Sequence, residues 1–251
     1  MKISPIIIVL LVLSGLAVWF YRQFLRTLSL PSRPRTIEQV VSVIGSPVEN
    51  RIRPAFERAN VAWPPRNLTV IAFKAERRLE LYSDFKERPR FVCSYPILAA
   101  SGTSGPKLRE GDRQVPEGFY RIELLNPNSQ YHLSLRVNYP NADDIDRARQ
   151  DGRDLSNLGG DIMIHGGAAS IGCLALGDPA IEELFILAAL VGLDNVRLII
   201  APLDFRRANP PAMPESAPIW TGELHERLRD AIARFPCSRP LTGEGEAPAE
   251  P

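Results

Sequence analysis

The sequence contains few of the residues that build disulfide or metal frameworks. Its 251 residues include three Cys (Cys93, Cys173 and Cys237) and three His (His132, His165 and His225). An odd and sparse Cys count argues against a disulfide scaffold and against a Cys-based zinc site. The His residues are too scattered for a metal-ligand spacing. We therefore expect neither a metal nor a cofactor.

The chain also lacks an excess of either charge. Its 30 Lys and Arg residues balance 29 Asp and Glu residues, which leaves a net charge of +1. Nucleic-acid-binding domains usually carry a clustered basic surface. We therefore expect no nucleic-acid partner. The apolar fraction of 45% is ordinary for a packed core, and the length suits one large domain or two small ones.

One long apolar run stands near the N-terminus, over residues 6–20. It is short for a membrane span, so it suits a signal peptide or a tilted signal anchor. Trp19, Phe20 and Tyr21 occupy the place where a cleavage site would have small residues, which favours an uncleaved anchor. Its orientation stays open, because the positive-inside rule alone would leave the C-terminal part in the cytoplasm: Lys2 precedes the run and Arg22, Arg26, Arg33 and Arg35 follow it.

Changes in composition divide the chain into five parts. Pro, Ser and Arg mark a linker after the apolar run, and a short helix capped by Thr36 should end at Pro47 before a second helical piece. The last residues have nothing apolar to bury. We expect a membrane anchor or signal segment (1–28), a linker with a helical collar (29–66), a main domain (67–204), an extension with a helix (205–240) and a disordered tail (241–251).

The main domain reads as mainly β with flanking helices, an α+β fold. Runs of β-branched and alternating apolar residues predict most of its strands, and amphipathic patterns predict the helices. The expected strands are 68–73, 78–82, 90–95, 118–124, 132–137, 161–165 and 195–200. The expected helices are 142–150, one capped by Asp178 that runs to about residue 190, and 221–235, with His225 on the polar side of the last one.

The stretch from 162 to 173 carries the chemistry. An apolar strand delivers His165, Gly166 and Gly167 let the chain turn, and a Gly-Cys pair follows. A His beside a Cys can generate a thiolate at neutral pH, so Cys173 is the candidate nucleophile and His165 the candidate base. Taken singly, each residue is more often structural: a buried thiol, or a core His bonded to a carbonyl. The backbone N–H groups of Gly172 and Cys173 are candidates for an oxyanion hole.

Other candidates allow two interpretations each. His132 suits either a structural position in an alternating strand or a substrate groove. Asp112 and Arg113 suit either an ion-paired turn or a contact with a substrate carboxylate. The basic loop residues Lys107, Arg109 and Arg113 fit the carboxylates of a peptide, although such loops are often merely solvated. Cys93 reads as a small core residue.

Two motifs together resemble a known family. The L,D-transpeptidases of the YkuD type share H-G, a spacer and S-H-G-C, and this chain has His165-Gly166 followed by Ser170-Ile171-Gly172-Cys173. Residues 107–122 are similar to the G-D-R-x-x-P-E-G-x-Y segment of the YafK-like subgroup, and residues 138–140 also match that subgroup. The resemblance covers roughly 67–203. Ile171 replaces the second His of the larger family, and Ala175 replaces a residue that is often Arg or Asn.

The resemblance implies a YkuD-type β-sandwich or barrel catalytic domain that acts on peptidoglycan, with roles in cell-wall organisation and cell shape. The thiolate would attack the peptide bond after meso-diaminopimelate in a stem peptide and pass the acyl group to an amine. We expect a membrane-anchored or exported enzyme facing the cell wall. The alternatives are an amidase with the same Cys-His pair, and a non-catalytic wall-binding module. The implied site comprises Cys173, His165 and the Gly166 carbonyl, with Ser170, Gly172, Tyr139 and Arg113 towards the substrate.

Overall fold

The computed structural model describes residues 34–103, 105–209 and 217–237. The predicted membrane segment (1–28), the first part of the predicted linker and the predicted tail (241–251) lie outside these residues. Within the described residues, no helix combines the length and the apolar character needed to cross a bilayer.

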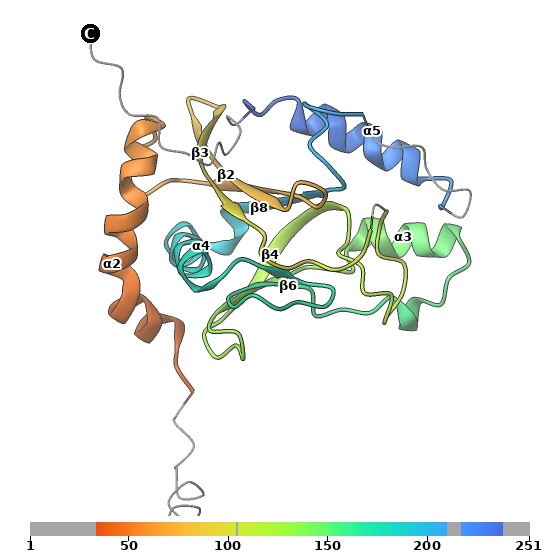
Figure 1. Cartoon of the computed structure of the whole chain (residues 1–251), viewed down its shortest axis with the longest axis horizontal. Coiled ribbons are helices and arrows are strands. Elements are labelled where there is room, and N and C mark those ends of the chain that lie inside the picture. The colour runs from red at the N-terminus through yellow and green to blue at the C-terminus, as the bar shows by residue number, and fades with distance from the viewer. Residues whose placement is uncertain (1–33, 104, 210–216, 238–251) are drawn as a thin grey trace, which may run out of the picture. The chain divides into compact units, whose positions relative to one another are not determined.

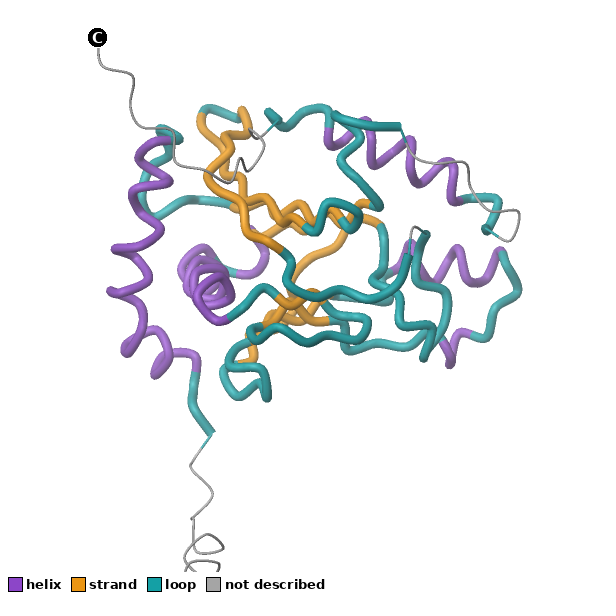
Figure 2. The backbone as a smooth tube through the Cα atoms, in the orientation of Figure 1, coloured by secondary structure: helices purple, strands orange, loops and turns teal. Residues whose placement is uncertain are grey.

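Within the described residues, eight strands form a single sheet that curls into a half-barrel (Figures 1 and 2). The pairs β1–β8 and β6–β7 are parallel, and the other pairs are antiparallel. The predicted mainly β fold with flanking helices is confirmed. In sheet order the strands are β3 (Arg88–Pro96), β2 (Arg78–Phe85), β1 (Leu68–Phe73), β8 (Val196–Ala201), β4 (Gly118–Asn126), β5 (Ser134–Val137), β6 (Met163–His165) and β7 (Leu174–Ala175).

Helix α4 (Asp178–Val191) fills the concave side of this sheet, and α2 (Ile37–Arg58) covers it from outside (Figure 1). Seven residues of α4 are buried, all of them apolar, so the helix is a core element. Its N-cap is Gly177 with a positive φ, and not Asp178 as predicted, because Asp178 is already the first helical residue and its carboxylate bonds elsewhere.

Helix α2 is continuous, which corrects the prediction of two helical pieces separated at Pro47. The Thr36 cap is confirmed: its hydroxyl accepts the Gln39 N–H, and the Gln39 side chain accepts the Thr36 N–H. Pro47 and Pro54 each remove one backbone donor, yet the helix runs through both. Tertiary packing outweighs this local cost, because the buried stripe of α2 joins the main core: Val40, Val48, Ile52, Ala55 and Phe56.

Helix α5 (Thr221–Ile232) covers the other face of the sheet, where a second apolar cluster lies. His225 is 4% exposed, so its predicted place on the polar side of this helix is wrong. Its Nε2 lies 2.9 Å from Glu117 Oε2, and this buried partner explains how the ring leaves solvent. The short helix α3 (Ala142–Gln150) matches the predicted span and has a capping box at Asn141.

A buried ion pair fixes the long loop that connects β3 to β4. Lys74 Nζ lies 2.9 Å from Glu117 Oε1 and also donates to the Gly105 and Val115 carbonyls. The Gly105 N–H donates to the same Glu117 oxygen. Glu117 therefore ties the loop to β1 and, through His225, to α5. Burial lowers the pKa of Lys74, and the negative charge of Glu117 only partly offsets this effect. Burial alone would raise the pKa of Glu117, but its bonds and charge interactions with His225 and Lys74 hold that pKa below its ordinary value.

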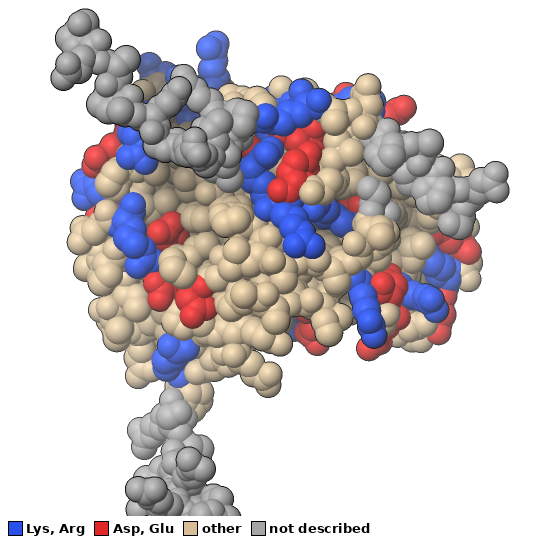
Figure 3. All heavy atoms as spheres, viewed as in Figure 1, with Lys and Arg blue, Asp and Glu red and all other residues tan. Residues whose placement is uncertain are grey.

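The molecular surface shows no region of one dominant sign on the face in Figure 3. Blue and red side chains alternate over it, in keeping with the net charge of +1.

We expect Glu117→Gln to reduce the free energy of unfolding by about 3 kcal/mol, because Lys74 would remain buried without its counter-ion. Urea denaturation at neutral pH measures this. Glu49→Gln is the matched control: its partner Arg53 is half-exposed, so the loss should stay below about 1 kcal/mol. Equal losses in the two variants would contradict the structural role of Glu117.

Candidate active site

The two candidate catalytic residues lie at the paired strands β6 and β7: His165 ends β6, and Cys173 comes directly before β7. Ile164 pairs with Leu174 and His165 with Ala175 in parallel register. One step before this register, the Met163 N–H donates to Cys173 Sγ at 3.3 Å. The sulfur of Cys173 therefore lies at the β6 backbone, two residues before His165 in that strand.

The His165 ring is held in one orientation, and its hydrogen bond sets the tautomer of the neutral ring. Its Nδ1 lies 2.7 Å from the Gly166 carbonyl oxygen, and a carbonyl only accepts. Nδ1 must therefore carry the proton of the neutral ring, which leaves a lone pair on Nε2. The Tyr131 ring covers the imidazole at 4.6 Å between centroids, and His165 is only 3% exposed. The arrangement shields His165 and, in the neutral ring, leaves Nε2 able to accept a proton.

The turn after His165 requires glycine at position 166. A Cβ on Gly166 would lie 2.6 Å from both Asp178 Oδ1 and the Tyr131 carbonyl oxygen. The same Asp178 oxygen accepts the Gly167 N–H at 2.8 Å. The first residue of α4 thus fixes the bend, and the bend presents the Gly166 carbonyl to the imidazole.

The Cys173 thiol is partly buried, and its surroundings raise its pKa. Burial is the main factor that raises the pKa of Cys173, and the Asp161 charge adds to it, while the Met163 N–H and Lys107 oppose both. The thiol lies 3.6 Å from the Asp161 carbonyl oxygen. Within the described part of the chain, no direct hydrogen bond joins the thiol to His165. Such bonds often form only when substrate arrives.

The other two cysteines have different surroundings. Cys93 packs against the main core as predicted, and burial raises the pKa of Cys93 to about 12. Cys237 is exposed.

The backbone N–H groups beside the thiol already have partners. The Gly172 N–H donates to Ser101 Oγ at 2.6 Å, and the Cys173 N–H donates to Ser170 Oγ at 3.1 Å. The predicted oxyanion hole is therefore filled by two hydroxyl oxygens in this structure. A substrate oxygen would have to replace them.

The loop before β4 lies against Gly172, and its basic residues differ in their surroundings: Lys107 is bonded within the loop, whereas the Arg113 side chain is exposed. Lys107 is bonded to Asp112 and to the Arg109 carbonyl. Asp112 also accepts three backbone N–H groups, so it stabilises the turn, which was one of its two expected roles. The Arg113 carbonyl accepts from the Ser101 hydroxyl, while its side chain is exposed near the site.

Two expected groove residues have other positions. Tyr139 is 5% exposed and donates to the Leu158 carbonyl, so it packs in the core rather than lining an open groove. His132 has a φ of 72° and lies before β5, so the predicted strand over 132–137 begins two residues too early; its Nε2 lies 2.9 Å from Glu182 Oε1 on α4.

Sequence reasoning missed Tyr131 and Ser101. Ser101 lies 71 positions from Gly172, and no local pattern connects them. Tyr131 precedes His132 in a polar turn. The presence of an aromatic residue at the end of a polar loop was the only sequence feature that could have indicated its role beside His165.

Comparisons with known proteins identify similar chains. The YkuD model, described as the L,D-transpeptidase catalytic domain, matches residues 67–197. YafK of Escherichia coli (strain K12), which is provisionally named as an L,D-transpeptidase, is 39% identical over 142 residues, or 55% of this chain and 54% of YafK. The match therefore spans about half the length of this curated relative.

Two solved structures are also similar. A point mutant of the helical cell shape determining protein Pgp2 from Campylobacter jejuni has a TM-score of 0.45 at 20% identity, covering 79% of this chain and 61% of that one. Bd1075 from Bdellovibrio bacteriovorus has a TM-score of 0.41 at 20% identity, with 67% and 55% covered.

We expect Gly166→Ala to reduce the free energy of unfolding by about 1–3 kcal/mol, because the added Cβ would overlap Asp178 and Tyr131. Urea denaturation measures the loss. Gly160→Ala is the control, since nothing lies within 4 Å of its Cβ position. A Gly166 variant as stable as the Gly160 variant would show that the turn is not tightly packed.

We expect Asp161→Asn to lower the pKa of the Cys173 thiol, because a negative charge near the sulfur disappears. More thiolate then exists at any pH below that pKa, and alkylation by iodoacetamide at pH 7–8 should accelerate up to about tenfold. Asn tolerates the φ of 53° at this position. Peptide mapping assigns the rate to Cys173, and Asp146→Asn on α3 is the control. A slower reaction would contradict the predicted sign.

Proposed function

Because the chain belongs to the YkuD family of L,D-transpeptidase catalytic domains, we propose that it is a cysteine L,D-transpeptidase of peptidoglycan stem peptides. In this proposal Cys173 forms the acyl-enzyme and His165 is the base. Residues 67–204 form the catalytic domain, with the helical collar and the extension on either side.

One observation carries the proposal: a thiol is hydrogen-bonded to the backbone of β6, and the same strand ends in an imidazole with an available Nε2. The bond from Nδ1 to the Gly166 carbonyl fixes which nitrogen is free. The bond from the Met163 N–H to Cys173 Sγ supports a thiol position beside the strand that carries His165. A nucleophile, a base and an orienting acceptor are the minimum set for thiol acyl transfer.

The reaction then follows in two displacements. His165 Nε2 takes the thiol proton as Sγ attacks the carbonyl carbon of the stem peptide. The carbonyl carbon–nitrogen bond breaks, the proton passes to the leaving amine, and a thioester remains on Cys173. The amine of a second stem peptide attacks the thioester, the carbon–sulfur bond breaks, and the thiol regains a proton.

Substrate binding must rearrange the hydroxyls beside the thiol. The developing oxyanion would accept the Gly172 and Cys173 N–H groups in place of Ser101 and Ser170. The exposed Arg113 side chain is placed to contact a stem-peptide carboxylate. Meso-diaminopimelate, which the family resemblance implies as the donor residue, supplies such a carboxylate.

The proposed location is the cell-wall side of a membrane, with residues 1–28 as the anchor or export segment. The charged residues around the apolar run do not set its orientation. The proposal for the location therefore depends on the proposed substrate, because peptidoglycan lies on the cell-wall side of the membrane.

An amidase is the second candidate, since the same Cys-His pair can pass the acyl group to water. Ile171 and Ala175, both close to the nucleophile, differ from the residues common in the larger family, and these differences leave hydrolysis open as an alternative to transfer. A non-catalytic wall-binding module is the third. Incubation of the full chain with purified muropeptides separates the three. New cross-links indicate a transpeptidase, shortened stems indicate an amidase, and binding without turnover indicates a module.

We expect a carbapenem to form a covalent adduct with the full chain, visible as a mass increase on the intact protein. Cys173→Ala should abolish the adduct, whereas Cys237→Ala should retain it, because Cys237 is an exposed thiol remote from His165 in sequence and fold. An adduct that survives in Cys173→Ala would show that the nucleophile is assigned wrongly.

The base is tested separately by His165→Gln, which should slow acylation about 100-fold. An unchanged rate would remove His165 from that role.

A further inference from the structure

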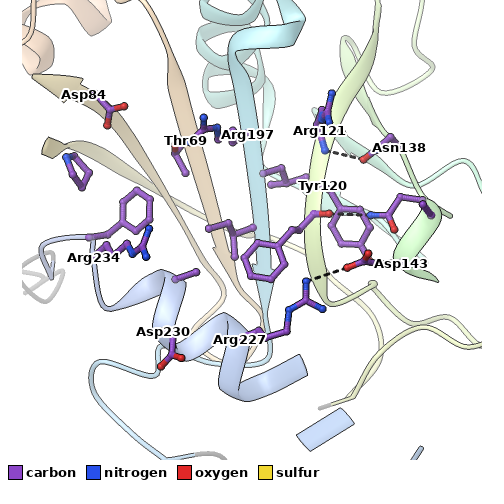
Figure 4. A pocket seen from close by; sticks show the side chains of 18 of the residues that line it. Thr69, Asp84, Tyr120, Arg121, Asn138, Asp143, Arg197, Arg227, Asp230 and Arg234 are labelled. Carbon is purple, nitrogen blue, oxygen red and sulfur yellow. Dashed lines mark hydrogen bonds and ion pairs between the residues drawn. The ribbon is translucent and has the colours of Figure 1, made fainter. Parts of the chain in front are cut away.

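A groove of about 950 Å³ lies where helix α5 stops covering its face of the sheet. The apolar cluster under α5 includes Ile199 and Ala201 of β8, whereas Arg197 on the same face of β8 lies beyond it. Figure 4 shows the groove between α5, the end of β2, β8 and β4. Neither Cys173 nor His165 lines it, so the groove is separate from the candidate active site.

Hydrogen-bond donors form a row across the groove. Thr69 on β1 pairs in register with Arg197 on β8, and Arg197 pairs with Arg121 on β4. Residues opposite each other on neighbouring strands project from the same face, and their Cβ atoms lie about 5 Å apart in an antiparallel pair. Asn138, whose Oδ1 accepts the Arg121 N–H, continues the row beside β4 (Figure 4).

Arg121 and Arg197 have no ion-pair partner within the described part of the chain. Like charges placed directly opposite on two strands are destabilising, so this pairing requires an explanation. The groove also has acidic residues, but Asp143 is bonded to Arg227. Asp84 and Asp230 lie away from Arg121 in Figure 4, and Glu87 is in the turn after β2. Among the residues that the structure describes, the two guanidinium groups therefore lack a counter-ion.

We propose that this groove binds a phosphate group of a soluble ligand, held by Arg121 and Arg197 with Thr69 and Asn138 as additional donors. Two guanidinium groups supply two positive charges, which match a phosphomonoester dianion. A carboxylate has only two oxygens, which one guanidinium can bind fully, whereas a phosphate has enough oxygens to engage both guanidinium groups and a hydroxyl. The concave shape favours a small ligand over a flat membrane surface.

Calorimetric titration of the full chain with inorganic phosphate, at constant ionic strength, tests the site. We expect saturable binding with one phosphate per chain. Arg121→Gln and Arg197→Gln should each weaken binding about tenfold or more. Arg53→Gln, which removes the same charge from a half-exposed position on α2, should leave phosphate affinity unchanged.

Three results would overturn the proposal. The first is the absence of saturable phosphate binding, and the second is equal weakening in the Arg53 variant. The third is a chain that does not bind inorganic phosphate but sediments with vesicles that contain phosphatidic acid, since this result would assign the groove to a lipid headgroup. Circular dichroism of each variant verifies that it is folded. Muropeptide turnover of Arg121→Gln is measured in parallel, so failure of this site and failure of the proposed enzyme activity are distinguishable.

Discussion

The carboxylate of Asp178 determines the geometry on which the candidate site depends. It accepts the Gly167 N–H, and together with the Tyr131 carbonyl it leaves no room for a side chain on Gly166. The resulting turn directs the Gly166 carbonyl back to His165 Nδ1. Because Asp178 is the first residue of α4, and α4 is buried in the core, the packing of the domain supports the orientation and the tautomer of one imidazole.

The site is rigid on one side and adjustable on the other. His165 ends β6, and the Cys173 thiol is bonded to the β6 backbone at Met163, so contacts with the sheet backbone position both residues. The hydroxyls of Ser101 and Ser170 are short polar groups that a substrate oxygen can displace from the N–H groups beside the thiol. Ser101 belongs to a loop whose base is fixed by the buried Lys74–Glu117 pair. Stability and substrate access therefore reside in different parts of the same loop.

The two faces of the sheet differ in how completely helices cover them. One face packs on α4 and α2 to form the main core, and the other carries the smaller cluster under α5. Because α5 covers only part of its face, the uncovered strands can carry arginines where a fully buried sheet would need apolar residues. The proposed phosphate site lies on this uncovered part of the sheet, outside the main core.

The sequence by itself determined the mainly β fold, most strand positions, the Thr36 cap and the stretch that carries His165 and Cys173, because these follow from local periodicity and short motifs. Tertiary structure decided the rest. It kept α2 helical through two prolines, buried His225 against Glu117, moved Tyr139 into the core and brought Ser101 to Gly172. These outcomes depend on contacts between residues far apart in the chain. The free energy of such contacts exceeds local conformational preferences, and no local sequence pattern indicates which residues will make them.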